Sequence, residues 1–438
     1  MTAFDALLVP DDLRAAVSAR AWLEALLQFE QALAEAGGEL GFVPAEAVAA
    51  ITAGCAATNF DSDAIWADGR AVGNPAEPLV RALRLRVGDA ERYVHLGATS
   101  QDAVDSAAML VAGSALGLIL DAVDDVAAVC AALAETHRDT PAVGRTLLQH
   151  AVPTTFGLKA AGWLDRILDA RRALRAADAG RAVQLGGAAG TLSGYGADGV
   201  RAVELVAQSL GLGVPVLPWH ASRTRVVELG AALALTAGVS AGIAFDLVLL
   251  AQTEVGEVSE VAAGGSSAMP HKRNPVHAVL ARGVSRLAAA NASVLTGSVE
   301  HEHERAAGAW HAEWEALSSA LLYTGAAVVE LGRSLTGLVV DVGRMRANLG
   351  LTGGLVYSEH VAAALGEQIG RQAAHELVAE AARRVSRGST FREALLEVSD
   401  GRLTGDEVDG LLDPASLSDS SGAFVDRALA RYRAQGDG

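Results

Sequence analysis

The sequence predicts an all-α fold built around a bundle of long helices, and three observations support this prediction. Hydrophobic residues make up 51% of the 438 residues and aromatic residues only 4%, so Ala, Leu and Val must fill the core. Five uninterrupted segments have the length and composition of long helices. No stretch convincingly alternates polar and apolar residues, which is the pattern of a half-buried strand.

The five long segments follow one another in the middle of the chain. They cover residues 101–137, 155–181, 222–258, 275–302 and 312–340. The first follows Thr99 and Ser100, which are good capping residues, and Asp102 and Asp105 suit the positive end of its dipole. At 1.5 Å per residue the third would be about 55 Å long. Helices of this length imply an elongated bundle, in which Gly238, Ala241 and Gly242 would let neighbouring backbones approach.

Shorter helices flank this bundle on both sides. They are interrupted by GNPAEP (73–78), by SRGST (386–390) and by DPASLSDSSG (413–422), and segments rich in Gly, Pro and Ser are typical helix breakers. We therefore predict three domains. They are an N-terminal helical domain at 1–98, a central long-helix bundle at 99–347 and a C-terminal helical domain at 348–438.

The charge of the chain argues against several classes of partner. A formal net charge of −17 disfavours a nucleic-acid surface and binding to an anionic membrane. The N-terminus lacks the basic and apolar pattern of a signal peptide. Cys55 and Cys130 lie far apart, without the spacing of a metal site or a disulfide framework. The resulting prediction is a cytoplasmic protein without a metal site.

Residues 230–251 form an apolar stretch that is long enough to span a membrane. However, Asp246 lies within this stretch, many of its residues are Gly or Ala, and strongly polar segments flank it. A helix that is apolar on every side also occurs at the centre of a large soluble bundle. We therefore predict a core helix here and no membrane as partner.

The segment GGSSAMPHKRNP (264–275) interrupts the helical pattern between two long helices. Its glycines expose backbone amides, and its prolines stiffen the exit and start the next helix. Ser266, Ser267, Lys272 and Asn274 concentrate hydrogen-bonding groups there. Lys272 is one of only two lysines among 35 basic residues, which favours a need for a compact ammonium group. We interpret the segment as a lid that closes on an anion, and the alternative is a solvated loop.

Three further polar patches contain candidate site residues. They are HLGATSQD (95–102), GRTLLQHAVPTTFG (144–157) and EHEHERAAGAWHAEW (300–314). The first lies at a helix N-terminus, which favours anions. The simpler explanations for the three patches are, in order, a capped helix start, a polar turn and a solvated run of charges. An isolated histidine such as His220 is expected to be structural. The candidates are His95, Thr99, Ser100, Arg145, Thr146, Gln149 and Arg305.

Together with QLGGAAGT (184–191), these patches resemble the fumarase/aspartase superfamily, whose signature pattern GSSxMPxKxNP is matched at 265–275. The phrases PTTFGLKAAGW, LGGAAGT and EHERAAGAWHAEW are most similar to its bacterial 3-carboxy-cis,cis-muconate cycloisomerase branch. The resemblance implies an all-α subunit of three domains in a homotetramer with a twenty-helix core. It also implies active sites built from three chains, a di- or tricarboxylate substrate, and no metal or organic cofactor.

The resemblance also implies roles for individual residues. Ser266 matches the catalytic base, while Lys272 and Asn274 match groups that hold a substrate carboxylate. His95 is a further catalytic candidate, as an acid or as a group that orients water. The remaining positions that match substrate-binding residues are Thr99, Ser100, Arg145, Thr146, Gln149, Gln184, Ser267, Met269 and Arg305.

Leu147 departs from the superfamily members that expel an amine or hydroxide, which usually have a histidine after GRT to protonate the leaving group. A hydrocarbon cannot donate a proton, but a carboxylate leaving group with a pKa of about 4 needs little assistance. Leu147 therefore favours lactone chemistry. It also departs from the tryptophan that is common at this position among the cycloisomerases, which leaves the shape of the pocket open.

The predicted function is cycloisomerisation of 3-carboxy-cis,cis-muconate to a carboxymuconolactone in aromatic catabolism, through an aci-carboxylate intermediate. The alternative is a C–N lyase acting on a substituted succinate of the nitrosuccinate or adenylosuccinate type. A third possibility is a catalytically silent helical scaffold. The presence of Ser266, Lys272 and Asn274 argues against it.

Overall fold

The computed structural model is mostly helical, as predicted, and describes residues 4–261, 264–266, 269–417 and 419–434. Contacts between residues divide the chain into two compact units. The first comprises Met1–Asp124, Asp169–Gly242 and Leu280–Glu330, and the second comprises Asp125–Leu168, Ile243–Val279 and Leu331–Gly438. Each unit is thus assembled from three separate stretches of the chain. The predicted division by chain order at residues 98 and 347 stays a prediction.

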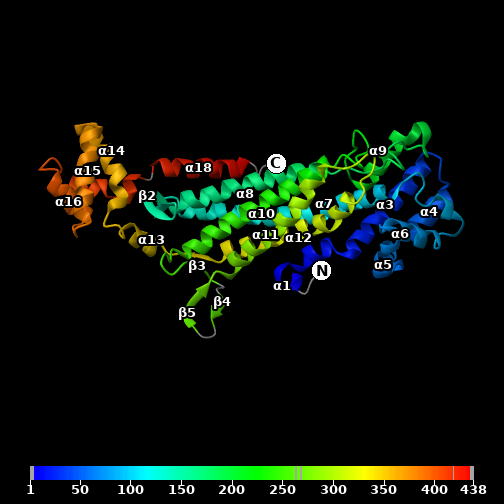
Figure 1. Cartoon of the computed structure of the whole chain (residues 1–438), viewed down its shortest axis with the longest axis horizontal. Coiled ribbons are helices and arrows are strands. Elements are labelled where there is room, and N and C mark those ends of the chain that lie inside the picture. The colour runs from blue at the N-terminus through cyan, green and yellow to red at the C-terminus, as the bar shows by residue number, and fades with distance from the viewer. Residues whose placement is uncertain (1–3, 262–263, 267–268, 418, 435–438) are drawn as a thin grey trace. The chain divides into compact units, whose positions relative to one another are not determined.

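Five long helices correspond to the five predicted segments (Figure 1). They are α7 (Ser100–Thr136), α8 (Phe156–Ala179), α10 (Thr224–Leu250), α11 (Val276–Thr296) and α12 (Ala309–Thr336). The prediction was wrong at the end of the third segment. A turn follows Leu250, Gly256 adopts a positive φ of 62°, and residue 258 already belongs to a strand. With 27 residues, α10 is therefore about 40 Å long.

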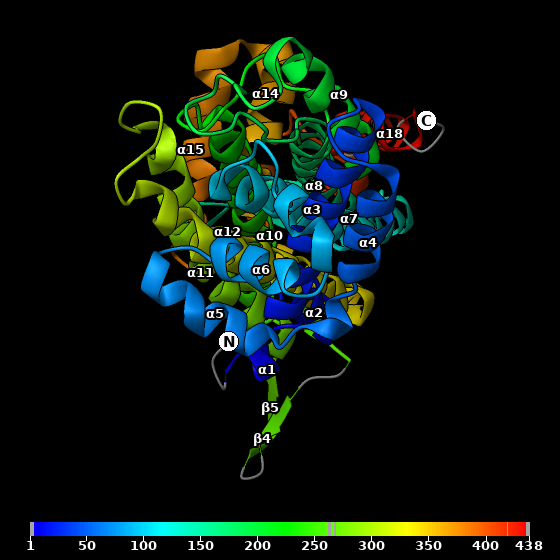
Figure 2. The ribbon, with the colours of Figure 1, turned by 90° about the vertical axis from the view of Figure 1, so that its right-hand side faces the viewer.

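Besides parts of the five bundle helices, the first unit contains further helices (Figure 2), some of which share a small hydrophobic core. They are α1 (Asp5–Leu8), α2 (Asp11–Ala16), α3 (Ala19–Glu39), α4 (Ala45–Gly54), α5 (Ser62–Val72), α6 (Ala76–Arg84) and α9 (Gly199–Leu210). Ile51 of α4 and Leu83 of α6 are fully buried in this core, together with Val94. Val94 directly precedes His95, so the core fixes the start of the first predicted patch.

Within the chain, α10 approaches α11 closely at Gly230, which was not among the predicted residues. A Cβ atom on Gly230 of α10 would lie 2.8 Å from Cβ of Leu295 on α11, so only glycine fits there. A Cβ atom on Gly238 would meet no described atom within 4 Å. Gly230 therefore allows the close contact between these two helices.

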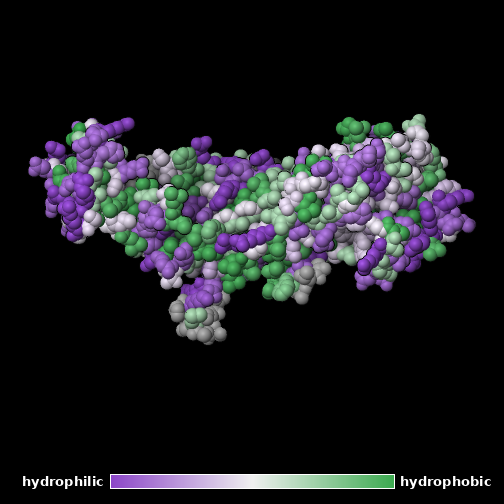
Figure 3. All heavy atoms as spheres, in the orientation of Figure 1, coloured by the Kyte–Doolittle hydropathy of each residue, from purple (hydrophilic) through white to green (hydrophobic). Residues whose placement is uncertain are grey.

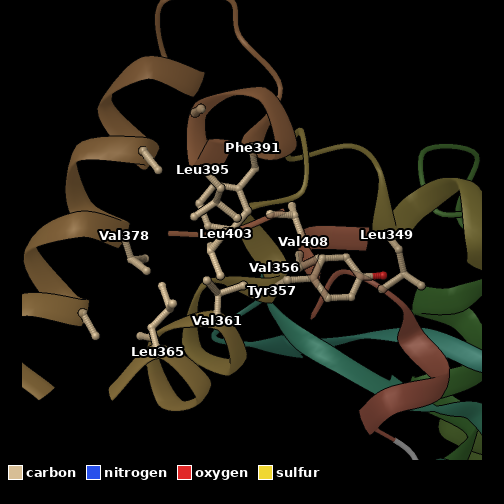
Figure 4. Close-up of a cluster of buried hydrophobic side chains, with 14 of the residues drawn as sticks. Leu349, Val356, Tyr357, Val361, Leu365, Val378, Phe391, Leu395, Leu403 and Val408 are labelled. Carbon is tan, nitrogen blue, oxygen red and sulfur yellow. The ribbon is translucent and has the colours of Figure 1, made fainter. Parts of the chain in front are cut away.

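The second unit contains a group of shorter helices around a second hydrophobic cluster (Figure 4). They are α13 (Val342–Leu349), α14 (Ser358–Ile369), α15 (Arg371–Val385), α16 (Phe391–Val398) and α17 (Gly405–Leu411). The last helix of this unit, α18 (Asp419–Ala434), contributes none of its described residues to the cluster. Phe391 and Leu395 lie at the centre of the cluster and are fully buried. Val143 belongs to the same cluster, so the patch around Arg145 is anchored on this core.

Six short strands occur among the described residues, contrary to the predicted absence of strands. They are β1 (Pro141–Thr146), β2 (Gln149–Thr155), β3 (Val258–Glu260), β4 (Gly264–Ser266), β5 (Met269–Asn274) and β6 (Leu338–Val340). They form three antiparallel pairs, β1–β2, β3–β6 and β4–β5. Two pairs, β1–β2 and β4–β5, are hairpins that overlap the predicted polar segments. Buried and exposed positions do not alternate along β1 or β2, so these strands lack the pattern that reveals a strand in sequence.

By length and composition, α7 and α10 are apolar enough to cross a membrane, but core helices of large bundles pass the same test. The most apolar window of α7 is 67% buried in the chain, whereas that of α10 is only 44% buried. Leu235 and Phe245 on α10, and Val279 on α11, remain between 44% and 52% exposed. Figure 3 shows the hydrophobic side chains over these two helices. Asp246, the polar residue within α10, accepts a hydrogen bond of 2.8 Å from the Trp163 indole.

Candidate active site

The loop before α7 brings His95, Thr99 and Ser100 together at the start of the helix, as predicted. All three are partly exposed. The backbone N–H of Thr99 donates to the Asp102 carboxylate at 3.0 Å, so this carboxylate caps the end of the helix. His95 Nδ1 lies 2.6 Å from Oε1 of Glu30, a buried residue of α3. Acidic side chains therefore hold both the start of α7 and the ring of His95.

Asp102 does more than complement the helix dipole, the role its position suggested. Its buried carboxylate accepts hydrogen bonds from the backbone N–H groups of Gly186 at 3.0 Å and Gly187 at 2.9 Å. His220 Nε2 lies 2.6 Å from the same carboxylate, which agrees with a structural role for this histidine. Asp102 thus docks the segment QLGGAAGT against the start of α7.

A buried cluster of charges joins α7 to α10 and α12. The Arg223 guanidinium donates to both oxygens of Asp105, at 2.8 and 3.0 Å, and its Nε donates to Glu313 at 3.0 Å. Trp310 also donates its indole N–H to Asp105 at 2.9 Å, and His301 Nε2 lies 3.3 Å from Glu313. Burial lowers the pKa of Arg223, but the two carboxylates outweigh this effect and raise it above its ordinary value. The arginine is therefore a permanent cation between two acids.

Gln184 and Arg305 lie beside this cluster. Gln184 is fully buried, and its Oε1 accepts a hydrogen bond of 2.9 Å from the backbone N–H of Trp219. Arg305 is partly exposed and donates to Oε1 of Gln101 at 2.9 Å and to the carbonyl of Ala188 at 2.8 Å. The structure thus brings together His95, Thr99, Ser100, Gln184 and Arg305 within the first unit.

Arg145, Thr146 and Gln149 lie at the turn of the β1–β2 hairpin in the second unit. The Arg145 guanidinium forms two hydrogen bonds, of 2.6 and 3.0 Å, with the buried carboxylate of Glu257. Thr146 and Gln149 face each other across the turn and are exposed. Arg145 is therefore held at the base of the turn, while Thr146 and Gln149 are presented at its tip. Substrate binding by these three residues stays a prediction.

Leu147 and Leu148 form the turn of this hairpin, and their side chains are 96% and 73% exposed. Both have a positive φ, 49° and 65°, as a two-residue hairpin turn with Asn-Gly would. Leucine at such positions is strained. The turn thus holds two apolar side chains in solvent at an energetic cost.

The lid predicted at 264–275 is the β4–β5 hairpin, which projects from the rest of the second unit (Figure 1). Ser266 ends β4, Met269 begins β5, and Lys272 and Asn274 lie further along β5. Met269 and Lys272 are exposed. Ser267 lies outside the described residues. The described candidates, Ser266, Met269, Lys272 and Asn274, therefore lie in one hairpin, and the catalytic and binding roles of this segment stay predictions.

Glu260 anchors the helix that follows this hairpin. Its buried carboxylate accepts hydrogen bonds from the backbone N–H groups of His277 at 3.2 Å and Ala278 at 3.0 Å, in the first turn of α11. Ser334 of α12 donates its hydroxyl to the same carboxylate at 2.6 Å. The carboxylate satisfies amides that the helix leaves unpaired, so the exit of the hairpin is fixed.

Backbone strain is concentrated in the predicted patches. Six non-glycine residues of the described chain have positive φ, and four of them are His95, Leu147, Leu148 and His303. Non-glycine residues in this conformation cost free energy and cluster at functional sites. Each of the three patches therefore contains at least one residue in this conformation.

A cleft with a volume of about 400 Å³ opens in the first unit at another place. Trp22, Trp66 and Trp314 line it together with Asp5 and Glu315, and none of the predicted site residues does so. Its carboxylates disfavour a polyanion. Among the described residues, no group of three or more His, Cys, Asp or Glu side chains could hold a metal ion.

Sequence reasoning missed Glu30, Arg223 and Glu313. Glu30 had a usable signal, since it lies at helical spacing between Leu26 and Leu33 on the buried face of α3. A carboxylate at such a position requires a buried partner. Arg223 and Glu313 are 90 residues apart, and Glu313 lies between Ala312 and Trp314 at the end of the third predicted patch. No local pattern indicates that they meet.

Comparisons with known proteins agree with the motifs. A lyase family matches residues 9–289, and the C-terminal part of adenylosuccinate lyase matches residues 354–428. The 3-carboxy-cis,cis-muconate cycloisomerase of Pseudomonas aeruginosa is 45% identical over 99% of this chain and 97% of its own. The nitrosuccinate lyase of Streptomyces davaonensis is also 45% identical, over 95% of this chain and 91% of its own.

The fold has a solved counterpart. The crystal structure of the 3-carboxy-cis,cis-muconate lactonizing enzyme from Pseudomonas putida is similar with a TM-score of 0.92 and 40% sequence identity. The similarity covers 98% of this chain and 99% of that chain. Both the helical bundle and the shorter flanking helices are therefore shared.

Proposed function

Because this chain belongs to the lyase family of the fumarase/aspartase superfamily, we propose that it is a 3-carboxy-cis,cis-muconate cycloisomerase. The proposal depends above all on its similarity, over essentially the whole chain, to a lactonizing enzyme in both sequence and fold. Features of the site also support the proposal. The start of α7, His95, Arg305 and the β4–β5 hairpin are suited to binding a substrate with several carboxylates. The enzyme is proposed to act in the cytoplasm, in aromatic catabolism.

The reaction adds one substrate carboxylate oxygen to a carbon–carbon double bond and closes a lactone ring. The electron pair of that double bond moves onto the neighbouring carboxylate, which becomes a doubly charged aci-carboxylate. A proton delivered to the adjacent carbon then completes the addition. Ser266 is the proposed proton-transfer group, acting as acid in this direction and as base in the reverse direction.

The doubly charged intermediate needs concentrated positive charge. Lys272 and Asn274 are proposed to hold the carboxylate on which this charge develops, together with backbone amides of the hairpin. Arg305 and the start of α7 bind the other carboxylates. The remaining proposed contacts are Ser100, Thr99, Arg145, Thr146, Gln149, Gln184, Ser267 and Met269. No metal or organic cofactor takes part in this proposal.

A homotetramer of three-domain subunits, with active sites shared between chains, forms part of the proposal. Only 44% of the most apolar window of α10 is buried in the single chain, and Leu235 and Phe245 are 45% and 44% exposed. Apolar surface of this extent marks a site of association. The strained tip at Leu147 and Leu148 is explained in the same way, since contact with another subunit would bury it.

Nitrosuccinate lyase remains the second candidate, because the relative with that name is as similar as the cycloisomerase in sequence identity. Leu147 agrees with both reactions, since nitrite and a carboxylate are weak bases. Nitrite leaves without a proton donor, and so does the lactone carboxylate in the reverse direction of lactonisation. Leu147 argues against an adenylosuccinate-type reaction, which expels an amine.

A panel of three substrates tests the proposal. We expect the enzyme to consume 3-carboxy-cis,cis-muconate with kcat/KM in the ordinary enzymatic range of about 10⁴–10⁸ M⁻¹s⁻¹. The loss of the conjugated diene is measured by ultraviolet absorbance. Nitrosuccinate is tested by release of nitrite, and adenylosuccinate by its change in absorbance. Preferred turnover of nitrosuccinate would replace the first candidate with the second, and turnover of none would exclude both.

Leu147→His tests the argument about the leaving group. We expect no increase in kcat for lactonisation, because a carboxylate oxygen gains little from a general acid. Leu148→His is the matched control, since it places the same group on the neighbouring exposed turn residue. Both variants are measured in the ultraviolet assay. A gain above about tenfold for Leu147→His alone would contradict unaided departure, because general acids contribute factors of about 10²–10⁴.

A further inference from the structure

We propose that Glu30 is a positioning residue that keeps His95 in the imidazolium form, with its Nε2–H directed toward the substrate. This inference rests on the proposed function, in which His95 is a site residue. Glu30 belongs to α3, 65 positions before His95 in the sequence, and no motif includes it. It acts through the histidine and not on the substrate.

The geometry of the pair supports this role. Oε1 of Glu30 lies 2.6 Å from Nδ1 of His95, and the side chain of Glu30 is only 1% exposed. The second oxygen, Oε2, is buried and has no hydrogen-bond partner among the described residues. A buried carboxylate with one partner requires a compensating charge on that partner. The protonated imidazole supplies this charge.

The tautomer of His95 follows from the same contact. A carboxylate only accepts hydrogen bonds, so Nδ1 must carry the proton that it shares with Glu30. In a neutral ring Nε2 would then be a bare acceptor, whereas in an imidazolium it is a donor. His95 Nε2 is not a buried atom and has no hydrogen bond to the described protein. It is therefore the atom available to a substrate carboxylate.

The backbone holds the ring in place at an energetic cost. His95 has a φ of 61°, in the left-handed region, and Gly97 two residues later has a φ of 72°. A Cβ atom on Gly97 would lie 2.6 Å from the ring of Tyr195, whose hydroxyl donates to the carbonyl of Leu96 at 2.9 Å. Strain of this kind persists where function requires one orientation.

The charges around the ring favour its protonated form. Burial lowers the pKa of His95, but the charge of Glu30, its hydrogen bond and the charge of Asp102 on α7 outweigh this effect. Arg84 on α6 opposes them, and the net result is a raised pKa. The imidazolium is thus present at low pH and is lost as the pH rises through this raised value.

The titration of His95 can be measured without any substrate. Exchange of the imidazole C2 proton with deuterium, followed by mass spectrometry of the peptide that contains His95, reports its protonation in the full-length enzyme. We expect a midpoint above the ordinary value of about 6.5 in the wild type. In Glu30→Gln the midpoint should fall by about one pH unit or more, because the charge that stabilises the imidazolium is gone.

Glu35→Gln is the matched control, since Glu35 lies on the same helix and bonds Gln31 and Ser209 instead of the histidine. It should leave the His95 midpoint unchanged. Glu30→Asp keeps the charge and should restore part of the wild-type midpoint. A wild-type midpoint at or below the ordinary value, or the same midpoint in Glu30→Gln, overturns the proposal even if the variant is poorly folded.

The second measurement is the pH profile of kcat/KM with 3-carboxy-cis,cis-muconate. In Glu30→Gln the pH at which kcat/KM falls on the high-pH limb should be lower, by the same amount as the His95 midpoint. KM should increase by a larger factor than the factor by which kcat decreases. A purely structural glutamate would lower the amount of active enzyme without moving the limb. A lower His95 midpoint without a change in the high-pH limb of kcat/KM overturns the positioning role. Failure of the wild type to convert the muconate concerns only the proposed function.

Discussion

Replacement of Ser266 by alanine is expected to lower kcat for 3-carboxy-cis,cis-muconate by about 10³-fold, within the range of a lost general acid–base group. The variant cannot deliver or remove the proton on carbon, whereas Lys272 and Asn274 can still hold the substrate. KM should therefore change much less than kcat. The measurement is steady-state kinetics in the ultraviolet assay, with the assembly checked by size-exclusion chromatography.

Ser293→Ala is the matched control for this substitution. Ser293 is an exposed serine on α11 whose hydroxyl donates only to the carbonyl of Ala290 at 2.7 Å. This control should retain wild-type kinetics. If Ser266→Ala keeps kcat within about tenfold of the wild type, the serine is not the proton-transfer group, since general acid–base groups contribute factors of about 10²–10⁴. His95 would then be the next candidate to examine.

The sequence was sufficient to predict the long helices, because their interiors contain no proline over many turns. The predicted start at 101 agrees with α7 at Ser100 because Thr99 and Asp102 provide local end signals. The end of α10 was misplaced because no proline and no strong capping pattern follows Leu250. The turn there depends on Gly256 and on the pairing of β3 with β6, which is contributed by residues 80 positions away.

The site was predictable only where its residues belong to motifs. His95, Thr99 and Ser100 are contiguous with the start of α7, and a helix start is visible in the sequence. The carboxylates that hold these motifs in place are scattered. Glu30 approaches His95 only through the packing of α3, and Glu257 approaches Arg145 across 112 positions. A single residue that pairs with a partner so far away in the chain produces neither a periodic pattern nor a motif in the sequence.

The scattered carboxylates hold the bases of the polar segments in place. Asp102, Glu257 and Glu260 each accept at least two hydrogen bonds at the base of a predicted patch, and all three are buried. Hydrogen bonds to a buried charged group are stronger than those between neutral groups. Each patch therefore has a fixed base, while its tip is exposed for a substrate or another subunit.

Arg223→Met is expected to be the most destabilising of the substitutions considered, by about 3–5 kcal/mol per subunit. The guanidinium lies between Asp105 and Glu313, and all three side chains are at least 95% buried. Its removal leaves two carboxylates without a counter-charge in the interior. Thermal and urea unfolding, followed by far-ultraviolet circular dichroism, should therefore show clearly lower midpoints.

Two variants distinguish this effect from a general sensitivity to losing arginine. Arg201→Met removes an exposed arginine that pairs with Glu204 at 3.0 Å, and it should leave both midpoints unchanged. Arg223→Lys keeps the charge but cannot bond both carboxylates in the same plane, so it should fall between the wild type and Arg223→Met. Midpoints for Arg223→Met equal to those of Arg201→Met would mean that the two acids are compensated by other groups. In that case the charge cluster would not be the element that joins α7 to α12.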